Sequence, residues 1–162
     1  MKVSFQKLNE NAVLPSYSTE GAAGLDMTAT SKTYDEHGNI VYGTGLAGKI
    51  PDGYVGLLFP RSSNAKKDLV LSNSVGMWDS DYTGEIFFKF KPSGQIWETT
   101  DYSENDEPYP TRWFPNEEAV IYNIGDRIGQ LIIIPYPQIE PEWVFELPKT
   151  TRRDKGWGST GS

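Results

Sequence analysis

Glycine and proline interrupt this chain at short intervals along almost its whole length. Sixteen glycines and eleven prolines are spread over 162 residues, and the stretches between them are rich in β-branched and aromatic residues. No stretch sustains the 3.6-residue hydrophobic period of an amphipathic helix. This pattern predicts an all-β fold of short strands, such as a sandwich or a jelly roll.

Seven apolar runs bounded by turn residues are expected to form strands. They are residues 3–8, 53–59, 69–71, 85–91, 119–124, 130–134 and 143–146. The one helix that we expect is short and starts near Ser62 or Ser63, where a hydroxyl group can cap the first turn.

The chain length fits a single domain with a proper hydrophobic core. Two segments look like insertions into it. Residues 32–48 are polar and rich in glycine, whereas residues 93–115 are acidic and contain several aromatic residues. The simplest interpretation of the second segment is a loop or an extra hairpin, and a contact surface for a partner is the alternative.

Several classes of site are excluded by composition. The chain has no cysteine and one histidine, His37, so disulfides, thiolate zinc sites, iron–sulfur clusters, a cysteine nucleophile and a multi-histidine metal site are all absent. No apolar run approaches the ~20 residues of a membrane span, and the N-terminus lacks the pattern of a signal peptide. We therefore expect a soluble, cytoplasmic protein without a membrane partner.

The net charge of −7, from 15 basic and 22 acidic residues, has the wrong sign for binding a nucleic-acid backbone. Most of it lies between Glu98 and Glu118, where seven acidic residues stand against Arg112 alone. By contrast, residues 149–155 carry four basic residues against Asp154. A small anionic ligand could be held there.

Five short segments carry the residues of a possible site. They are AAGLDM (22–27), FPRSS (59–63), LSNSVGMWDSDYTGEI (71–86), IGDRIGQL (124–131) and RRDKGWGSTG (152–161). The first presents Asp26 at a glycine turn. The second sets Arg61 beside two hydroxyl groups at a helix start, a combination that binds phosphate. The third places Asn73, Asp79 and Tyr82 within the length of one hairpin.

In this order and spacing, the five segments resemble the motifs of the trimeric dUTP diphosphatases, the dUTPases. The resemblance runs from about Ala22 to Gly161, and its third and fourth motifs are the most specific. The fourth motif differs from the usual form mainly at Gly129, where alanine is common. In the fifth, Arg153 and Lys155 replace two glycines and Trp157 replaces a phenylalanine.

The resemblance implies a jelly-roll-like β-barrel over residues 1–148, with one short helix and a mobile C-terminal arm over residues 149–162. It implies a homotrimer with active sites at the subunit interfaces. The implied reaction is the hydrolysis of dUTP to dUMP and pyrophosphate with Mg²⁺.

The same resemblance assigns roles to single residues. Asp79 matches the carboxylate that activates the attacking water, since an ionised aspartate can accept its proton. Asn73 and the backbone around Gly76 would bind uracil, and the Tyr82 ring would lie under the deoxyribose and leave no room for a 2′-hydroxyl. Asp81 is expected to make structural contacts only.

The other motifs supply the residues that are expected to bind the phosphates and the metal. Asp26 matches the residue that meets Mg²⁺ through water. Asp126 and Arg127 are expected to brace each other or a neighbouring subunit. Either Arg152 or Arg153 is the phosphate arginine of the arm, and Trp157 would stack on uracil. The residues assigned to the triphosphate are Arg61, Ser62, Ser63, Gln130, Arg152, Ser159 and Thr160, and Gly158 is also expected to bind the substrate.

Two other functions are compatible with parts of the sequence. A dCTP deaminase shares the fold and an Arg-Ser-Ser segment, but it does not need the aromatic residue within GWGSTG. A regulatory nucleotide-binding protein could act on a protein partner through the acidic insertion. The aspartate–tyrosine hairpin and the complete fifth motif favour the diphosphatase.

Overall fold

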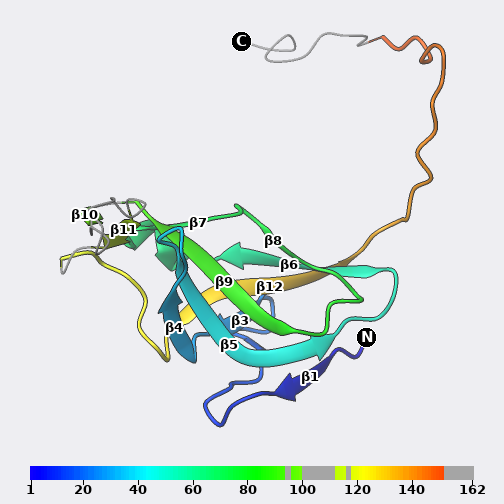
Figure 1. Cartoon of the computed structure of the whole chain (residues 1–162). Helices are drawn as coiled ribbons and strands as arrows, with labels where there is room; N and C mark the ends of the chain where they lie inside the picture. The colour runs from blue at the N-terminus through cyan, green and yellow to red at the C-terminus, as the bar shows by residue number, and fades with distance from the viewer. Residues whose placement is uncertain (94–95, 100–111, 116–117, 152–162) are drawn as a thin grey trace, which may run out of the picture.

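The computed structural model describes residues 1–93, 96–99, 112–115 and 118–151 and shows two five-stranded antiparallel sheets facing each other (Figure 1). The first sheet has the order β1 (Ser4–Lys7), β5 (Ile40–Lys49), β9 (Glu85–Pro92), β7 (Leu69–Leu71), with β4 (Ser31–Tyr34) also paired to β5. The second has the order β2 (Ser16–Tyr17), β3 (Leu25–Thr28), β12 (Arg127–Pro135), β6 (Tyr54–Pro60), β8 (Gly76–Trp78). The predicted all-β, jelly-roll-like fold is confirmed, although in the described part the sheets do not close into one barrel.

The core lies between the two sheets and follows the two-residue alternation of the strands. In β9, for example, Ile86, Phe88 and Phe90 are buried, whereas Phe87 and Lys89 face outward. Each buried phenylalanine contributes about 1.5–3 kcal/mol relative to an exposed one. The core therefore fixes the register of β9, whose first two residues are the last two of the third motif.

Five of the seven predicted strands are confirmed as β1, β6, β7, β9 and β12. The strand predicted over 119–124 is wrong, because the backbone hydrogen bond from the Asp68 N–H to the Val120 carbonyl at 2.9 Å does not continue into a strand ladder, and side chains bind several of the other backbone groups. Asp68 Oδ2 accepts from the Val120 N–H at 2.8 Å, and Lys67 Nζ donates to the Ile121 carbonyl at 2.9 Å. Tyr42 Oη donates to the carbonyl of the buried Tyr122, also at 2.9 Å.

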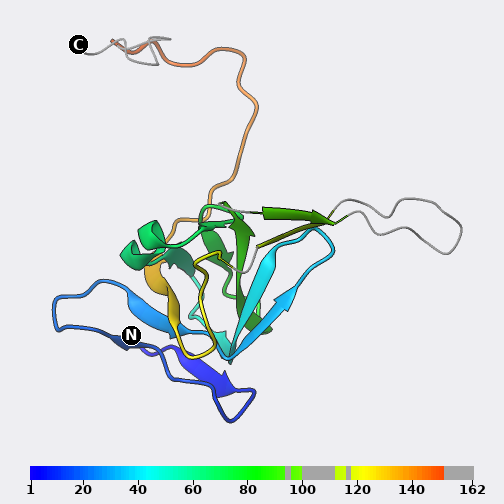
Figure 2. The same cartoon turned by 90° about the vertical axis from the view of Figure 1, so that its left-hand side faces the viewer.

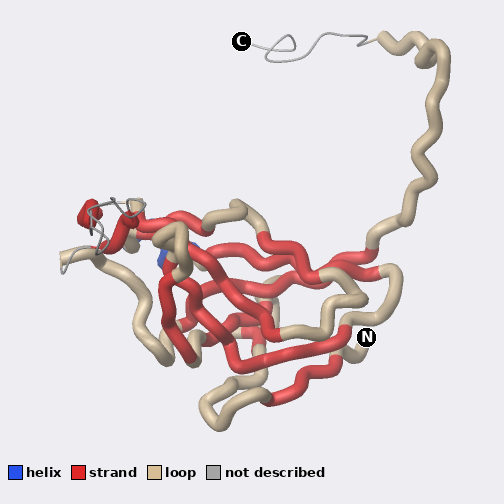
Figure 3. The backbone as a smooth tube through the Cα atoms, in the orientation of Figure 1, coloured by secondary structure: helices blue, strands red, loops and turns tan. Residues whose placement is uncertain are grey.

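The strand predicted over 143–146 is also wrong in the single chain. After β12 the chain leaves both sheets and runs outward as a loop, which Figures 1 and 3 show from residue 136 onward. Trp143 and Phe145 are fully exposed along it. No described strand lies beside this segment to accept its hydrogen bonds.

Residues 32–48, which we expected as an insertion, form β4 and nearly all of β5. They belong to the core, because β5 pairs with three strands and buries Tyr42. The backbone of β5 shifts register against β9 between Gly43 and Ala47, and Glu85 Oε1 accepts from the Gly45 N–H there at 2.8 Å.

The second expected insertion contains the hairpin predicted as one of its alternatives. β10 (Ile96–Thr99) pairs antiparallel with β11 (Arg112–Pro115), and Figure 2 shows this ribbon projecting sideways from the two sheets. Most of the acidic residues of 93–115 lie outside the described residues.

The predicted short helix is confirmed as the 3₁₀ turn η1 (Ser62–Lys66). Its cap differs from the prediction, because Arg61 occupies the N-cap position and no side chain caps the first turn. In the described part of the chain, no helix has the length and apolar character needed to span a membrane.

Candidate active site

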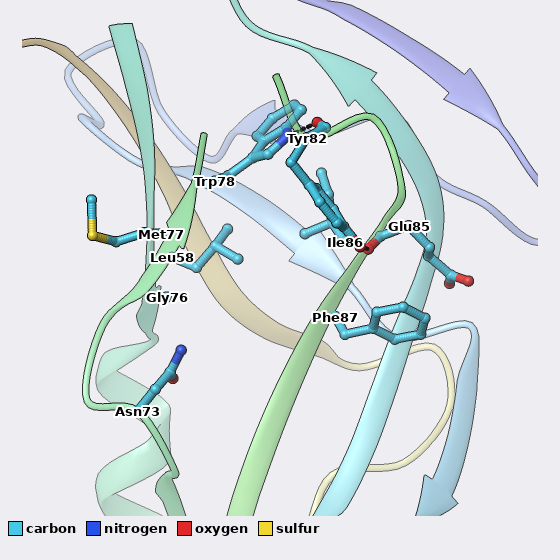
Figure 4. Close-up of a pocket in the computed structure, with 9 residues that line it drawn as sticks. All are labelled: Leu58, Asn73, Gly76, Met77, Trp78, Tyr82, Glu85, Ile86 and Phe87. Carbon is cyan, nitrogen blue, oxygen red and sulfur yellow. Dashed lines mark hydrogen bonds between the residues drawn. The ribbon is translucent and has the colours of Figure 1, made fainter. Parts of the chain in front are cut away.

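A hollow of about 180 Å³ lies between β8 and the start of β9 (Figure 4). Its walls come from β6, the β7–β8 loop, β8, the β8–β9 turn and β9. The lining residues are Leu58, Asn73, Gly76, Met77, Trp78, Tyr82, Glu85, Ile86 and Phe87. A second hollow of about 230 Å³ shares four of these residues and extends towards Ser72 and Lys89. Together they form a recess that combines apolar walls with one amide and one phenol.

The β7–β8 loop supplies the amide side of this recess in a strained conformation. Ser74 has a φ of 60°, which is unusual for a residue other than glycine, and the Val75 N–H donates to the Asn73 carbonyl at 2.6 Å. Such strain persists only where surrounding structure holds it, and it is concentrated at ligand sites. A Cβ atom at Gly76 would lie 3.0 Å from the Leu58 Cβ, so glycine keeps this wall open.

The β8–β9 turn supplies the phenol side. The Tyr82 ring is 47% exposed and its hydroxyl donates to the Glu85 carbonyl at 2.9 Å. Gly84 makes this possible, because a Cβ atom there would lie 2.6 Å from Tyr82 Oη. Asp79 begins the same turn and is exposed. The turn thus carries the Tyr82 ring, which lines the recess, and three residues before it the exposed carboxylate of Asp79, which lines neither hollow.

A second cluster gathers around Asp26, whose side chain is buried on β3. Arg61 donates to it through Nε (3.0 Å to Oδ1) and Nη2 (3.4 Å to Oδ2), and Arg127 Nη1 donates to Oδ2 at 2.9 Å. Gln130 Nε2 donates to Oδ1 at 3.2 Å, in a space that Gly24 leaves open. Three sequence motifs therefore meet at one carboxylate.

These contacts decide what Asp26 can offer a metal. A carboxylate has about four acceptor positions, and the four donor atoms fill them. A Mg²⁺ ion, or a water bound to it, finds no free acceptor on Asp26 in this arrangement. The described residues also contain no group of three or more His, Asp or Glu side chains placed to hold a metal.

Ser62 and Ser63 of the second motif, which were expected to bind phosphate, directly follow Arg61 in the chain. Burial raises the pKa of Tyr122, while the nearby Ser63 hydroxyl and Arg61 guanidinium oppose that rise. Ser62 is exposed at the start of η1. The predicted bracing of Asp126 against Arg127 is not observed, because Asp126 Oδ2 instead accepts from the Asn123 N–H at 2.8 Å.

The structure thus divides the predicted site residues into two groups within one chain. Asn73, Gly76 and Tyr82 line the recess, whereas Asp26, Arg61 and Gln130 meet elsewhere, and no residue of the second group lines either hollow. The residues predicted from the fifth motif, Arg152, Trp157, Gly158, Ser159 and Thr160, lie outside the described part of the chain.

Sequence reasoning missed some residues of both groups. Leu58 and Phe87 line the recess, and Arg127 binds Asp26. Strand alternation indicates which face of its own strand each of Leu58 and Phe87 occupies. It cannot show that β6 and β9, which belong to different sheets, bring the two side chains together. The sequence motif alone gives Trp78 no role, although its indole N–H donates to the Tyr82 carbonyl in the turn that contains Asp79.

Comparison with known sequences identifies the family of the chain. The sequence pattern of the family described as dUTPase matches residues 10–96, more than half of the chain. The chain belongs to the dUTPase family. The match spans the first three motifs, which contain Asp26, Arg61 and Tyr82.

Curated dUTPase relatives extend the likeness over the whole chain. The deoxyuridine 5′-triphosphate nucleotidohydrolase of Hydrogenobaculum sp. (strain Y04AAS1) is 34% identical over 164 residues, covering 99% of both chains. The enzyme of the same name from Hahella chejuensis (strain KCTC 2396) is 32% identical and covers 100% of this chain and 95% of its own.

Solved dUTPase structures share the fold. A mutant dUTPase of Staphylococcus bacteriophage 80alpha, solved with dUpNHpp, superposes with a TM-score of 0.75 at 26% identity and 99% coverage of both chains. A mutant dUTPase from phage phi11 of S. aureus, described with a structural Mg(II) ion, has a TM-score of 0.64 at 28% identity, covering 90% of this chain and 98% of that one.

Proposed function

We propose that this protein hydrolyses dUTP to dUMP and pyrophosphate. The observation that carries the proposal is the recess, which has an amide at one wall, a tyrosine ring at the other and the exposed Asp79 at the turn beside it, in a chain of the dUTPase family. In this proposal Asp79 accepts a proton from a water molecule. The water oxygen bonds to the α-phosphorus, and the bond to the bridging oxygen of pyrophosphate breaks.

Selectivity for the nucleoside would come from the recess. Uracil presents two carbonyl oxygens and one N–H, which the Asn73 amide and the backbone around Gly76 can pair with in a water-poor space. A deoxyribose that lies on the Tyr82 ring leaves no volume for a 2′-hydroxyl. The Tyr82 hydroxyl is itself tied to the Glu85 carbonyl, which limits how far the ring can turn.

The triphosphate would be met by Arg61, Ser62, Ser63 and Gln130, with residues from the fifth motif. Asp26 supports this role by holding Arg61 and Gln130 through hydrogen bonds of 3.0 and 3.2 Å. A guanidinium oriented in advance loses less conformational entropy when it binds phosphate.

Magnesium is part of the proposal as a companion of the substrate. When bound to the triphosphate, Mg²⁺ neutralises part of its charge. The filled acceptor positions of Asp26 do not fit a metal ligand, directly or through water. None of the roles that we propose for the protein's residues requires Asp26 to bind the metal.

We further propose a homotrimer with active sites at the subunit interfaces. The separation of the recess from the Asp26 cluster supports this, since a second copy can bring its Asp26 cluster to the recess of the first. The outward segment after β12 supports it too. This segment exposes the apolar residues Ile139, Trp143, Val144, Phe145 and Leu147. Large exposed apolar patches mark sites of protein–protein contact.

Pyrophosphate release from dUTP, dCTP, dTTP and UTP tests the proposal, each nucleotide being assayed with Mg²⁺ and with a chelator. We expect release from dUTP alone and its loss in chelator. Equal release from UTP would contradict the role of Tyr82. Ammonia release from dCTP without pyrophosphate release would replace the proposal by a deaminase, for which the relatives give no support.

A further inference from the structure

The backbone of the turn between β8 and β9 does little by itself to hold Asp79 and Tyr82 in the positions that the proposed reaction requires. Asp79 and Tyr82 are exposed, and one backbone hydrogen bond, from the Tyr82 N–H to the Asp79 carbonyl at 3.1 Å, spans the turn. Turns of this kind open easily unless other groups hold them. Proton transfer from a bound water requires the carboxylate to stay within a few tenths of an ångström of its place.

Two side chains from outside the turn bind its carbonyl groups. Trp78 Nε1 donates to the Tyr82 carbonyl at 2.9 Å (Figure 4), and Lys49 Nζ donates to the Ser80 carbonyl at 2.7 Å. Trp78 directly precedes Asp79, so its bond joins the start of the turn to its end. The Lys49 side chain is half exposed and also pairs with Asp52 at 3.1 Å, which leaves Trp78 as the less solvated anchor.

The Trp78 indole is held in one position in the core by close packing. The ring is 2% exposed and packs against Phe5 with ring centroids 5.7 Å apart. A Cβ atom at Gly48 would lie 2.7 Å from Trp78 Cη2, and one at Gly56 would lie 3.0 Å from Cε3. Two glycines therefore make room for this ring. Since Gly48 and Gly56 belong to different sheets, the indole is clamped between the sheets and its N–H direction is fixed.

We infer that Trp78 is a positioning residue for the proposed reaction, with Lys49 as its weaker partner. By holding the Tyr82 carbonyl, the indole N–H fixes the directions in which Asp79 and the Tyr82 ring project. The inference rests on the proposed function. It predicts that loss of this one hydrogen bond reduces both turnover and discrimination against UTP, while the recess and the phosphate cluster stay intact.

The test compares Trp78→Phe, which keeps a ring but removes the donor, with Phe90→Leu, which loosens the core beside Tyr42 and Tyr122 instead of beside Trp78. Unfolding midpoints, kcat and KM for dUTP and UTP, and hydrogen exchange of the Tyr82 amide are measured for each. We expect Trp78→Phe to lower kcat for dUTP at least tenfold, to raise the UTP-to-dUTP ratio of kcat/KM several-fold and to speed exchange at Tyr82. Phe90→Leu should lower the unfolding midpoint with kcat within about twofold of the wild type.

A folded Trp78→Phe protein with wild-type kcat, discrimination and exchange would overturn the inference and leave the proposed function standing. A wild-type protein without dUTP turnover would overturn both. If Trp78→Phe does not fold, Lys49→Met takes its place with Lys49→Arg as the conservative control. Faster Tyr82 exchange and a lower kcat in Lys49→Met, restored in Lys49→Arg, would support fixation of the turn, and their absence would contradict it.

Discussion

Gly129 faces the ring of Phe88, and no room for a methyl group remains between them. A Cβ atom on Gly129 would overlap Cε1 and Cζ of that ring, which is 1% exposed. The departure from the alanine that is common in this family thus has a local cause, because Phe88 occupies the space that the methyl group would need.

Gly129→Ala is therefore expected to destabilise the fold by about 1–3 kcal/mol, the usual cost of overpacking a core. Thermal unfolding measures this, with Gly21→Ala as the control since no atom lies within 4 Å of a Cβ there. Phe88→Leu introduced together with Gly129→Ala should recover part of the loss. A Gly129→Ala protein as stable as the wild type would show that Phe88 moves freely.

Sequence reasoning works at the residue scale where a residue type has few alternative uses. Asn73 and Tyr82 were expected in one pocket and line the same recess. Arg61 was expected to meet phosphate, yet its partner in the chain is Asp26, 35 residues away. No local pattern predicts that pairing, because it depends on the order of strands in the second sheet.

At the element scale, the β4–β5 hairpin is tied to the recess through Asp35. Asp35 accepts from Asn39 Nδ2 at both oxygens (3.1 and 3.0 Å) and from Lys89 Nζ at 3.3 Å, and Asn39 Oδ1 accepts from the Ser72 hydroxyl at 2.8 Å. Burial raises the pKa of Asp35, but the hydrogen bonds from Asn39, His37 and Lys89 outweigh it and lower the pKa overall.

The lowered pKa of Asp35 determines how the free energy of unfolding changes with pH. A carboxyl group with a lower pKa in the folded state stabilises the fold above its unfolded pKa of ~3.9, and the stabilisation is lost as the pH falls through the folded value. We expect Asp35→Asn to lower the free energy of unfolding at pH 7 and to differ less from the wild type near pH 3. Denaturant unfolding at both pH values measures this, and Glu36→Gln is the exposed control. An equal difference at both pH values would contradict the account.

The elements that sequence missed have identifiable physical reasons. β5 contains Gly43, Gly45 and Gly48, which weaken the strand pattern, and Gly48 is present because the Trp78 ring occupies the space beside it. Residues 119–124 have the composition of a strand, but the side chains of Asp68 and Lys67 bind two of its backbone groups where a strand ladder would need a neighbouring backbone. Propensity cannot foresee either effect, since both come from tertiary contacts.

For the whole molecule, the separation of the recess from the Asp26 cluster leads to a test of assembly. If each site combines Asp79 of one subunit with Arg61 of another, an Asp79→Asn protein and an Arg61→Ala protein will each be inactive alone. Co-expressed in equal amounts, they should form mixed trimers in which about a quarter of the sites are complete. Pyrophosphate release that stays at the level of the single variants would show that the site lies within one chain.

In the proposed reaction, Asp79 is the group that activates water. The decisive measurement is kcat for pyrophosphate release from dUTP by the wild type, by Asp79→Asn and by the neighbouring control Asp81→Asn, with folding verified by circular dichroism. We predict that Asp79→Asn lowers kcat by about 100-fold or more and that Asp81→Asn changes it little. A folded Asp79→Asn protein with wild-type turnover would show that Asp79 does not activate the water.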